Sequence, residues 1–259
     1  EEVAKFRAAR SMWAKITKEL GATNIDAQKL RFHTQTGGST LTAQQPMNNI
    51  VRVAIQTLAA TMGGTQSLHT NGYDEALSLP TEQAAMIALR TQQIVAEESG
   101  ICDTVDPWAG SYFIESMTKE MEESAFELIA KIDGMGGAVS AIEQGFVQEQ
   151  IAQASYEYQK AVERNEKIIV GVNKYVSKDL VSTPIMKIDA SIEKQQVDRL
   201  KAFKANRDLQ AVNTCLEKIS HAASTTENLM PLVIEAVEQH CTLGEIAHCL
   251  RKVWGEYKG

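Results

Sequence analysis

The chain has 259 residues, of which 44% are hydrophobic and 23% are charged, and its formal net charge is −7. This is an ordinary soluble globular composition, and the negative charge makes nucleic acid an unexpected partner. No apolar run approaches the roughly 18 residues of a membrane span, and we expect no secretory signal at the start. The 4 cysteines are too few and too scattered for a disulfide scaffold, so we expect a reducing, cytoplasmic setting.

The first predicted element is a helix over residues 3–20, because apolar and aromatic residues recur there at helical spacing with charges between them. Gly21 follows directly, as a glycine commonly does at the end of a helix. The chain opens with Glu1 rather than Met, and its first residues already read as helix. We therefore expect a fragment or one piece of a split protein.

Residues 29–36 predict a strand with an unusual polar face. Arg31, His33 and Gln35 alternate there with Phe32 and two threonines, and two glycines follow the run. Alternate residues of a strand point to the same side. A half-buried strand usually has apolar residues on one face, whereas this one has three hydrogen-bonding groups beside a permissive backbone. We interpret this face as a site rather than as core.

Helix and strand patterns alternate through the remainder of the first 100 residues. The predicted elements are a helix over residues 47–62, a strand over residues 65–70 and a helix over about residues 81–98. Such alternation favours parallel strands joined by crossover helices. Ligands bind at the carboxyl ends of the strands in these folds, which places the polar stretches 33–38 and 69–72 at the site.

Beyond a turn-rich aromatic segment at residues 101–112, the pattern is mostly helical. The predicted helices cover about residues 115–132, 138–144, 148–165, 192–206, 208–222, 228–240 and 243–256, and one short strand is predicted over residues 168–172. Two His-Cys pairs, at residues 240–241 and 248–249, lie eight residues apart. No CxxC or HxxxH spacing accompanies them, so we favour buried thiols beside partly exposed imidazoles over a metal site.

Seven long segments carry a family resemblance that spans essentially the whole chain. They are LRFHTQT (30–36), LTAQQPMNNIVR (41–52), GGTQSLHTN (63–71), DEAL (74–77), DPWAGS (106–111), IVGVNKY (169–175) and CTLGEI (241–246). In these runs the chain resembles the large, catalytic chain of the adenosylcobalamin-dependent acyl-CoA mutases, the methylmalonyl-CoA mutase family. The resemblance is to the carboxy-terminal portion of that chain.

The resemblance implies an α/β fold. Residues 1–112 would form the last βα units of a (β/α)8 barrel, and residues 113–259 a helical belt with at most one short strand. In this family coenzyme A threads the barrel and adenosylcobalamin caps its carboxyl end, where the cofactor supports a radical rearrangement of the acyl carbon skeleton. The alternative is a non-catalytic partial barrel that serves assembly or interaction.

The resemblance also assigns roles to residues of the two strands and the turns that follow them. The residues expected to bind substrate are Arg31, His33, Gln35, Gln66 and Ser67, the last two at the end of the second strand. The residues expected to bind the cofactor are Gly38, Ser39, Glu75, Ala76 and Ser78. The backbone of Gly38 would lie against the corrin ring, and Glu75 would accept hydrogen bonds from ribose hydroxyls. Pairing with a nearby acid is an alternative role for Arg31.

Two features of the resemblance bear on substrate and partners. Ser39 stands where methylmalonyl-CoA mutases often carry tryptophan, so the acyl group is left open between the methylmalonyl-CoA/succinyl-CoA type and a related branched acyl-CoA. The Asp-x-His-x-x-Gly motif that supplies the lower cobalt ligand in the family is absent from this chain. We therefore expect an isomerase that is incomplete without an amino-terminal barrel portion and a cobalamin-binding subunit or domain. An open barrel edge also predicts an oligomer.

Overall fold

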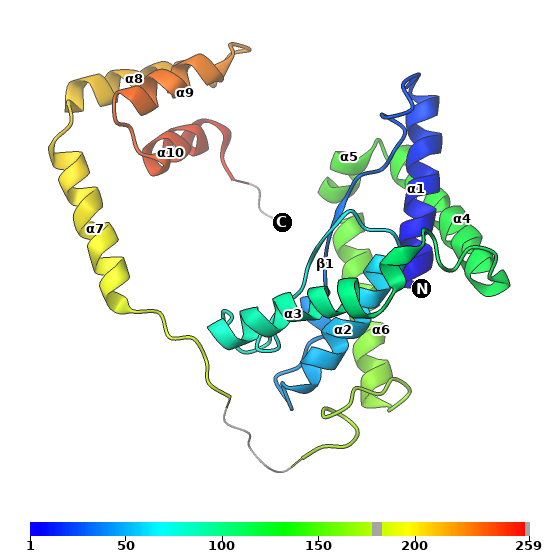
Figure 1. The fold of residues 1–259 in the computed structure, drawn as a ribbon. Helices are drawn as coiled ribbons and strands as arrows, with labels where there is room; N and C mark the ends of the chain where they lie inside the picture. Colours follow the sequence, from blue (N-terminus) through cyan, green and yellow to red (C-terminus); the bar gives the residue numbers. More distant parts are fainter. Residues whose placement is uncertain (178–182, 257–259) are drawn as a thin grey trace. The chain divides into compact units, whose positions relative to one another are not determined.

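The computed structural model describes residues 1–177 and 183–256, which fall into two compact units, Glu1–Met186 and Lys187–Gly259. The first unit contains a small parallel sheet and most of the helices (Figure 1). The second contains helices alone among its described residues. The boundary expected between barrel and belt, at residues 112 and 113, stays a prediction.

The first unit follows the predicted order of helix, strand, helix, strand, helix over its first 100 residues. Its elements are α1 (Glu2–Glu19), β1 (His33–Gln35), α2 (Asn48–Met62), β2 (Ser67–His69), α3 (Glu82–Glu98), α4 (Tyr112–Gly134), α5 (Ala138–Glu143) and α6 (Phe146–Glu163), with 3-10 turns at Gly38–Thr40 and Ile101–Asp103. The ends of these helices agree with the predicted signals. Thr81 caps α3 by accepting a hydrogen bond from the Ala84 N–H, and Gly21 takes a positive φ after α1.

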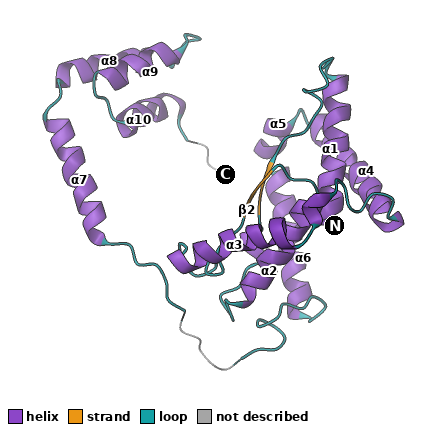
Figure 2. Cartoon of the chain, viewed as in Figure 1, coloured by secondary structure: helices purple, strands orange, loops and turns teal. Residues whose placement is uncertain are grey.

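The two strands pair in parallel, as predicted, with His33 opposite Ser67 and Gln35 opposite His69 (Figure 2). Both strands are shorter than predicted, at three residues each. The strand predicted from residue 29 begins only at His33, because the Phe32 N–H donates to the side chain of Gln66, 2.8 Å away, instead of to a neighbouring strand. The ladder extends by one bond at the other end, from the Thr36 N–H to the carbonyl of His69.

Helices pack against one another and against the far face of the sheet. Phe32 stacks on Phe6 of α1, with ring centroids 5.2 Å apart. The buried residues of α2 and α3 recur at helical spacing and are mostly small or β-branched, and they are Asn49, Val53, Thr57, Ala60, Ala84, Ala88, Thr91 and Val95. Small side chains at these positions let the two helices approach closely. The apolar contacts therefore lie away from the polar face of β1.

The strand predicted over residues 168–172 is wrong. The structure has only an isolated bridge between Val170 and Lys174 there. Gly171 takes a φ of +84° and its N–H donates to the Lys174 carbonyl, so the chain turns back instead of extending. The β-branched residues before Gly171 favour an extended conformation, but the turn at Gly171 prevents a continuous strand.

The second unit consists of α7 (Ala190–Ala205), α8 (Leu209–Ala222), α9 (Leu229–Glu238) and α10 (Leu243–Trp254). These four helices confirm the predicted ones to within two residues at each end. Its core is built from α8, α9 and α10, and the fully buried members are Val212, Cys215, Ile219, Ala236, Cys241 and Ile246. Thr242 begins α10 with a capping box. The Thr242 hydroxyl accepts a hydrogen bond from the Glu245 N–H, and the Glu245 carboxylate accepts one from the Thr242 N–H. No helix in the described parts of either unit is long and apolar enough to cross a membrane.

Candidate functional site

The polar face predicted for the first strand is present and open to solvent. Arg31, His33 and Gln35 are all exposed, whereas Thr34 between them is half-buried. Ser67 and His69 of β2 are exposed as well. Their register opposite His33 and Gln35 puts all four on one side of the parallel pair. The sheet therefore has one face packed on helices and one face made of hydrogen-bonding groups.

Hydrogen bonds connect this face across the two strands. His33 Nδ1 lies 2.7 Å from Ser67 Oγ, so two of the residues expected to bind substrate contact each other. Gln35 Nε2 donates to Asn71 Oδ1 over 2.9 Å. Arg31 has neither a hydrogen bond nor an ion pair among the described residues, so within that part of the chain no acid occupies its guanidinium, which is available to a ligand.

Gln66 and Ser67 are placed differently from the expectation. Gln66 comes just before β2 and Ser67 is its first residue, so both lie at the amino end of the strand rather than at its carboxyl end. Gln66 Oε1 accepts from the Phe32 N–H and its Nε2 donates to the Gly64 carbonyl over 2.8 Å, so both ends of the carboxamide are used inside the chain. These positions are a correction, and the substrate roles of Gln66 and Ser67 stay predictions.

The carboxyl ends of β1 and β2 come together at Gly38. A methyl group at this position would lie 2.9 Å from Asn71 Nδ2 and 3.4 Å from Glu75 Oε1. The first distance is shorter than a normal carbon contact, so even alanine would push Asn71 away. Gly38 thus brings the turn after β1 against the turn after β2, and the carboxylate of Glu75 stands beside the glycine.

The other residues expected at the cofactor lie in the same two turns. Ser39 is exposed in the 3-10 turn after β1, and Ala76 is exposed beside Glu75 after β2. Ser78 is half-buried and its hydroxyl donates to the Leu79 carbonyl over 2.9 Å. The structure therefore gathers all five predicted cofactor residues at one end of the sheet, and their roles stay predictions.

Asn71 lies in the polar stretch 69–72 expected at the site, but no role was predicted for it individually. It is buried, its N–H donates to Thr36 Oγ1 over 3.0 Å, and its Nδ2 donates to the Thr36 carbonyl over 3.1 Å. Since Asn71 Oδ1 also accepts from Gln35, one side chain ties the end of β1 to the end of β2. A polar residue directly after a strand, inside a segment that carries the family resemblance, was the available signal.

Asp74 is a second residue for which no role was predicted, and it shapes the turn that presents Glu75. Its side chain is fully buried, and Oδ2 accepts from the Thr81 N–H at 2.9 Å and from Thr81 Oγ1 at 3.1 Å. A carboxylate at the start of a helix is stabilised by the helix dipole. Oδ1 is equally buried and has no hydrogen-bond partner. The turn from Asp74 to Thr81 is therefore held by one buried carboxylate.

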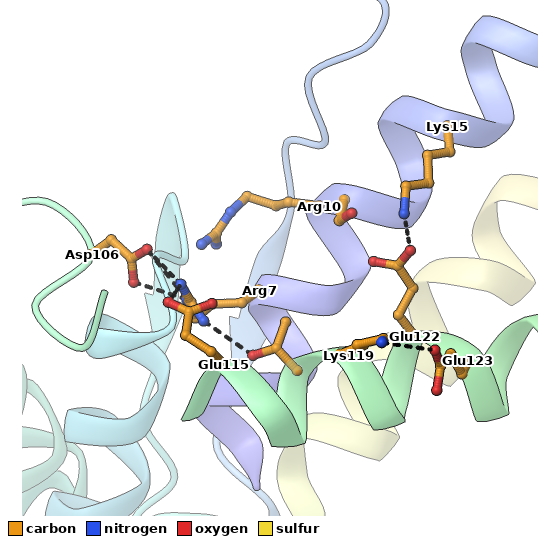
Figure 3. Close-up of a pocket in the computed structure, with 10 residues that line it drawn as sticks. Arg7, Arg10, Lys15, Asp106, Glu115, Lys119, Glu122 and Glu123 are labelled. Carbon is orange, nitrogen blue, oxygen red and sulfur yellow. Dashed lines mark hydrogen bonds and ion pairs between the residues drawn. The ribbon is translucent and has the colours of Figure 1, made fainter. Parts of the chain in front are cut away.

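A pocket of about 670 Å³ lies between α1 and α4, apart from the sheet face, and is lined by acidic and basic side chains (Figure 3). Arg7 is at its centre and donates to Asp106 over 3.0 Å and to Glu115 over 2.8 Å. These bonds raise the pKa of Arg7, and the bond to Glu115 contributes most. The same bond lowers the pKa of Glu115. Lys15 pairs with Glu122 further along and lowers its pKa.

We interpret the charged residues of the α1–α4 pocket as a structural ion-pair network. Each Lys or Arg side chain at its centre already has a carboxylate or carbonyl partner. Arg10 donates to the carbonyls of Gly63 and Gly64, and burial lowers its pKa. The network fastens α4 and the turn at residue 106 to α1, and among the described residues each of its charged groups is already engaged by an acid, a base or a backbone carbonyl.

Among residues 1–177 and 183–256, no group of three or more His, Cys, Asp and Glu could hold a metal ion. The cysteines of the two His-Cys pairs contribute to packing, whereas His240 and His248 are exposed. Cys241 is buried and its thiol donates to the Val212 carbonyl over 3.7 Å, while Cys249 Sγ lies 3.1 Å from the Leu216 carbonyl. Burial raises the pKa of Cys241.

The sequence profile of the family described as methylmalonyl-CoA mutase matches residues 1–256. The chain is 45% identical over 261 residues to the 2-hydroxyisobutanoyl-CoA mutase large subunit of Aquincola tertiaricarbonis, an alignment that covers 100% of this chain and 46% of that protein. It is 44% identical over 259 residues to the methylmalonyl-CoA mutase large subunit of Porphyromonas gingivalis, covering 99% and 36%. With the methylmalonyl-CoA mutase of Escherichia coli it shares 43% over 256 residues, covering 98% and 36%. The chain thus spans less than half the length of each of these relatives.

Proposed function

Because the chain belongs to the methylmalonyl-CoA mutase family, we propose that it is the carboxy-terminal portion of the large chain of an adenosylcobalamin-dependent acyl-CoA mutase. The observation that carries the proposal is the polar sheet face that ends at Gly38 and Glu75. Two parallel strands present exposed His33, Gln35 and Ser67 along their length. The turns that follow them meet at a glycine and a carboxylate. On this proposal β1 and β2 are the last strands of a (β/α)8 barrel.

The residues at the strand ends fit adenosylcobalamin. A flat macrocycle requires close approach to backbone, and the turn at Gly37, Gly38 and Ser39 has no large side chain. A ribose offers hydroxyl donors, and Glu75 supplies an exposed carboxylate next to Gly38. The turn at Ala76 is small and exposed. Gly38, Ser39, Glu75, Ala76 and Ser78 are the residues that would hold the cofactor.

The polar face fits an acyl-CoA that runs along the strands toward the cofactor. Arg31, which has no partner among residues 1–177 and 183–256, stands nearest the amino end and offers a cation to phosphate or carboxylate. His33 and Gln35 follow at the spacing of one strand face and offer hydrogen bonds to a thioester or an acyl group. Ser67 holds His33, and Gln66 holds the start of β1.

When bound, the cofactor supplies the radical chemistry of the carbon-skeleton rearrangement. The residues of this chain bind and orient. The bond between His33 and Ser67 limits the rotation of the imidazole, and the bond between Gln35 and Asn71 fixes the carboxamide. Preorganised donors of this kind lower the cost of ordering a substrate. Closing the face against the remaining barrel strands would exclude water from reactive species.

The proposed enzyme acts as an assembly. Within the described residues the parallel pair has two free edges, and unpaired strand edges favour association. We propose that an amino-terminal barrel portion covers them and that a cobalamin-binding subunit or domain covers the strand ends, in a cytoplasmic oligomer. The two relatives named as large subunits fit such a division of labour.

The acyl group is the least constrained part of the proposal. The chain is 45% identical to a 2-hydroxyisobutanoyl-CoA mutase and 44% identical to a methylmalonyl-CoA mutase, so identity favours neither substrate. Ser39 leaves more room at the strand ends than the tryptophan common in methylmalonyl-CoA mutases. A methylmalonyl-CoA/succinyl-CoA pair and a related branched acyl-CoA are the two classes to assay.

The proposal is tested by assembling the protein that carries this chain with its amino-terminal portion and cobalamin-binding partner. Addition of adenosylcobalamin should change the cofactor's absorbance spectrum, and isomerisation of one acyl-CoA class should follow. The alternative, a non-catalytic assembly or interaction module, predicts a stable complex with no spectral change. A complex that forms without spectral change or turnover would therefore replace the enzymatic proposal with that alternative.

A further inference from the structure

Asn49, near the start of α2, joins the two loops that carry the candidate cofactor residues. Its side chain is fully buried. Its Nδ2 donates to the Thr42 carbonyl over 2.9 Å and to the Tyr73 carbonyl over 2.8 Å, and its Oδ1 accepts from the Thr42 N–H at 3.1 Å. Thr42 follows Ser39 by three residues, and Tyr73 precedes Glu75 by two. One carboxamide therefore holds both loops.

Arg52, one turn further along α2, fixes the orientation of this carboxamide. Its Nη1 donates to Asn49 Oδ1 over 2.7 Å and to Thr42 Oγ1 over 3.0 Å. Since a guanidinium can only donate, the Asn49 atom facing it must be the oxygen, which leaves the amide nitrogen for the two carbonyls. Nη2 of Arg52 donates to the Val170 carbonyl over 2.8 Å. The carboxamide is thus fully satisfied, and the segment around Val170 supports it.

Ordinary capping of the helix does not account for these bonds. A capping asparagine accepts from a backbone N–H of its own helix, whereas the Oδ1 of Asn49 accepts from Thr42 and Arg52. The N-cap position of α2 is Met47, and no side chain caps it. The loops also meet at Gly38, beside Asn71 and Glu75, so Asn49 supplies a second point of closure.

We propose that Asn49 is a positioning residue that sets the spacing between the turn at Gly38 and the turn at Glu75. Its carboxamide acts through backbone carbonyls, without touching the cofactor. This inference rests on the proposed function for its effect on adenosylcobalamin. The clamp itself is a property of the two loops and can be measured with no cofactor present.

The test compares two substitutions at Asn49 with a matched control at the neighbouring residue. Asn49→Asp keeps the shape but replaces both donor hydrogens with an acceptor that faces two carbonyls. Asn49→Ser removes the carboxamide without adding a charge, and it keeps the experiment informative if the aspartate variant does not fold. Asn48→Asp is the control, because in the part of the chain that the structure describes the Asn48 Nδ2 donates to the Gln45 side chain alone.

The first readout is amide hydrogen exchange of residues 38–44 and 72–79 in the assembled protein without cobalamin. Both Asn49 variants should exchange these amides faster, on the order of tenfold, with α8 and α10 unchanged as internal references. The Asn48→Asp control should match the wild type. Unchanged exchange in both loops would overturn the clamp, whether or not the protein binds cobalamin.

The second readout is steady-state isomerisation. The KM for adenosylcobalamin should rise about tenfold in Asn49→Ser while the KM for acyl-CoA stays near the wild-type value. A general loss of folding would reduce active enzyme without this split. Loosened loops with an unchanged KM for adenosylcobalamin would overturn the positioning role. A wild type that binds no cobalamin would refute the proposed function, and the exchange result would still decide on the clamp.

Discussion

The strand ends of the first unit and the helical core of the second unit use buried groups in opposite ways. At the strand ends the fully buried side chains include Asn49 and Asp74, and each holds a neighbouring loop through hydrogen bonds. In the second unit the fully buried side chains include Val212 and Ile219, which contact apolar neighbours. A buried amide or carboxylate needs defined partners, so it specifies loop geometry, whereas an apolar core mainly stabilises. Buried polar groups that fix loops are therefore suited to a binding site, and the apolar core of the second unit is suited to stabilising the fold.

The largest effect should come from the apolar core. Ile219→Ala should destabilise the second unit by about 2–5 kcal/mol, because a fully buried side chain leaves a cavity. The measurement is amide exchange in α8 and α10. Leu209→Ala, at an exposed position on the same helix, should stay within about 0.5 kcal/mol of the wild type. Equal losses from both substitutions would show that this core does not hold the unit together.

Gly38→Ala should have the next largest effect, and on the site alone. The added methyl group would lie 2.9 Å from Asn71 Nδ2 and force that side chain to move. Overpacking of this kind costs about 1–3 kcal/mol, or about fivefold to 150-fold in the KM for adenosylcobalamin. Gly134→Ala is the control, since nothing lies within 4 Å of its added methyl group. A wild-type KM in Gly38→Ala would remove Gly38 from the site.

An acid-dependent effect should separate the ion pair of the second unit from its core. Arg207 donates to both carboxylate oxygens of Glu245, over 2.6 Å and 2.5 Å, and these bonds hold the pKa of Glu245 well below its usual range. A depressed carboxylate pKa gives stability that is complete above the unfolded value of about 4.3 and is lost as the pH falls toward the folded value. The pair should therefore weaken below about pH 4.

Glu245→Gln tests whether the ion pair contributes stability that is lost on acidification. It should lower the stability of α10 by about 1–3 kcal/mol at neutral pH, a range discounted because Glu245 is partly exposed. It should also flatten the loss of stability on acidification, measured by amide exchange across pH 3–7. Exposed Glu238→Gln serves as the control and should leave the acid profile unchanged. An acid profile that is equally steep in Glu245→Gln would assign the dependence to other carboxylates.

The smallest effect should come from the solvent-exposed face. Ser67→Ala removes the partner of His33 Nδ1, a bond worth about 0.5–1.5 kcal/mol, which corresponds to about a twofold to tenfold rise in the KM for acyl-CoA. Exchange protection in both units should not change. Ser116→Ala on α4 is the control. A rise in the KM for adenosylcobalamin instead of that for acyl-CoA would reassign Ser67 to the cofactor side.

Local pattern predicted much of this fold. The period-two alternation at Arg31, His33 and Gln35 identified a polar face, and glycine and threonine signals located helix ends. Pattern failed at residues 168–172, where the φ of Gly171 turns a β-branched run back on itself. It also placed Gln66 and Ser67 at the wrong end of β2. Both errors come from backbone geometry that the neighbouring residue types do not determine.

The hydrogen-bond partners of Asn49 and Asn71 could not be predicted from pattern, for a different reason. Asn49 and Asn71 hold main-chain atoms of distant loops, and the partner of such a bond is any residue that the fold brings near. Asn49 sits in a helix pattern and Asn71 in a turn pattern, where asparagine is common. Their burial and their partners become visible only when the loops after β1 and β2 are placed together.

The most direct test of the contrast between site and support is one titration of adenosylcobalamin into three assembled proteins, followed by absorbance. The three are the wild type, Gly38→Ala and Ile219→Ala, at a temperature where all are folded. We expect tight binding by the wild type and Ile219→Ala, and binding weakened about tenfold or more in Gly38→Ala. Equal affinity in all three, or equal weakening in both variants, would contradict the assignment of the cofactor to the ends of β1 and β2.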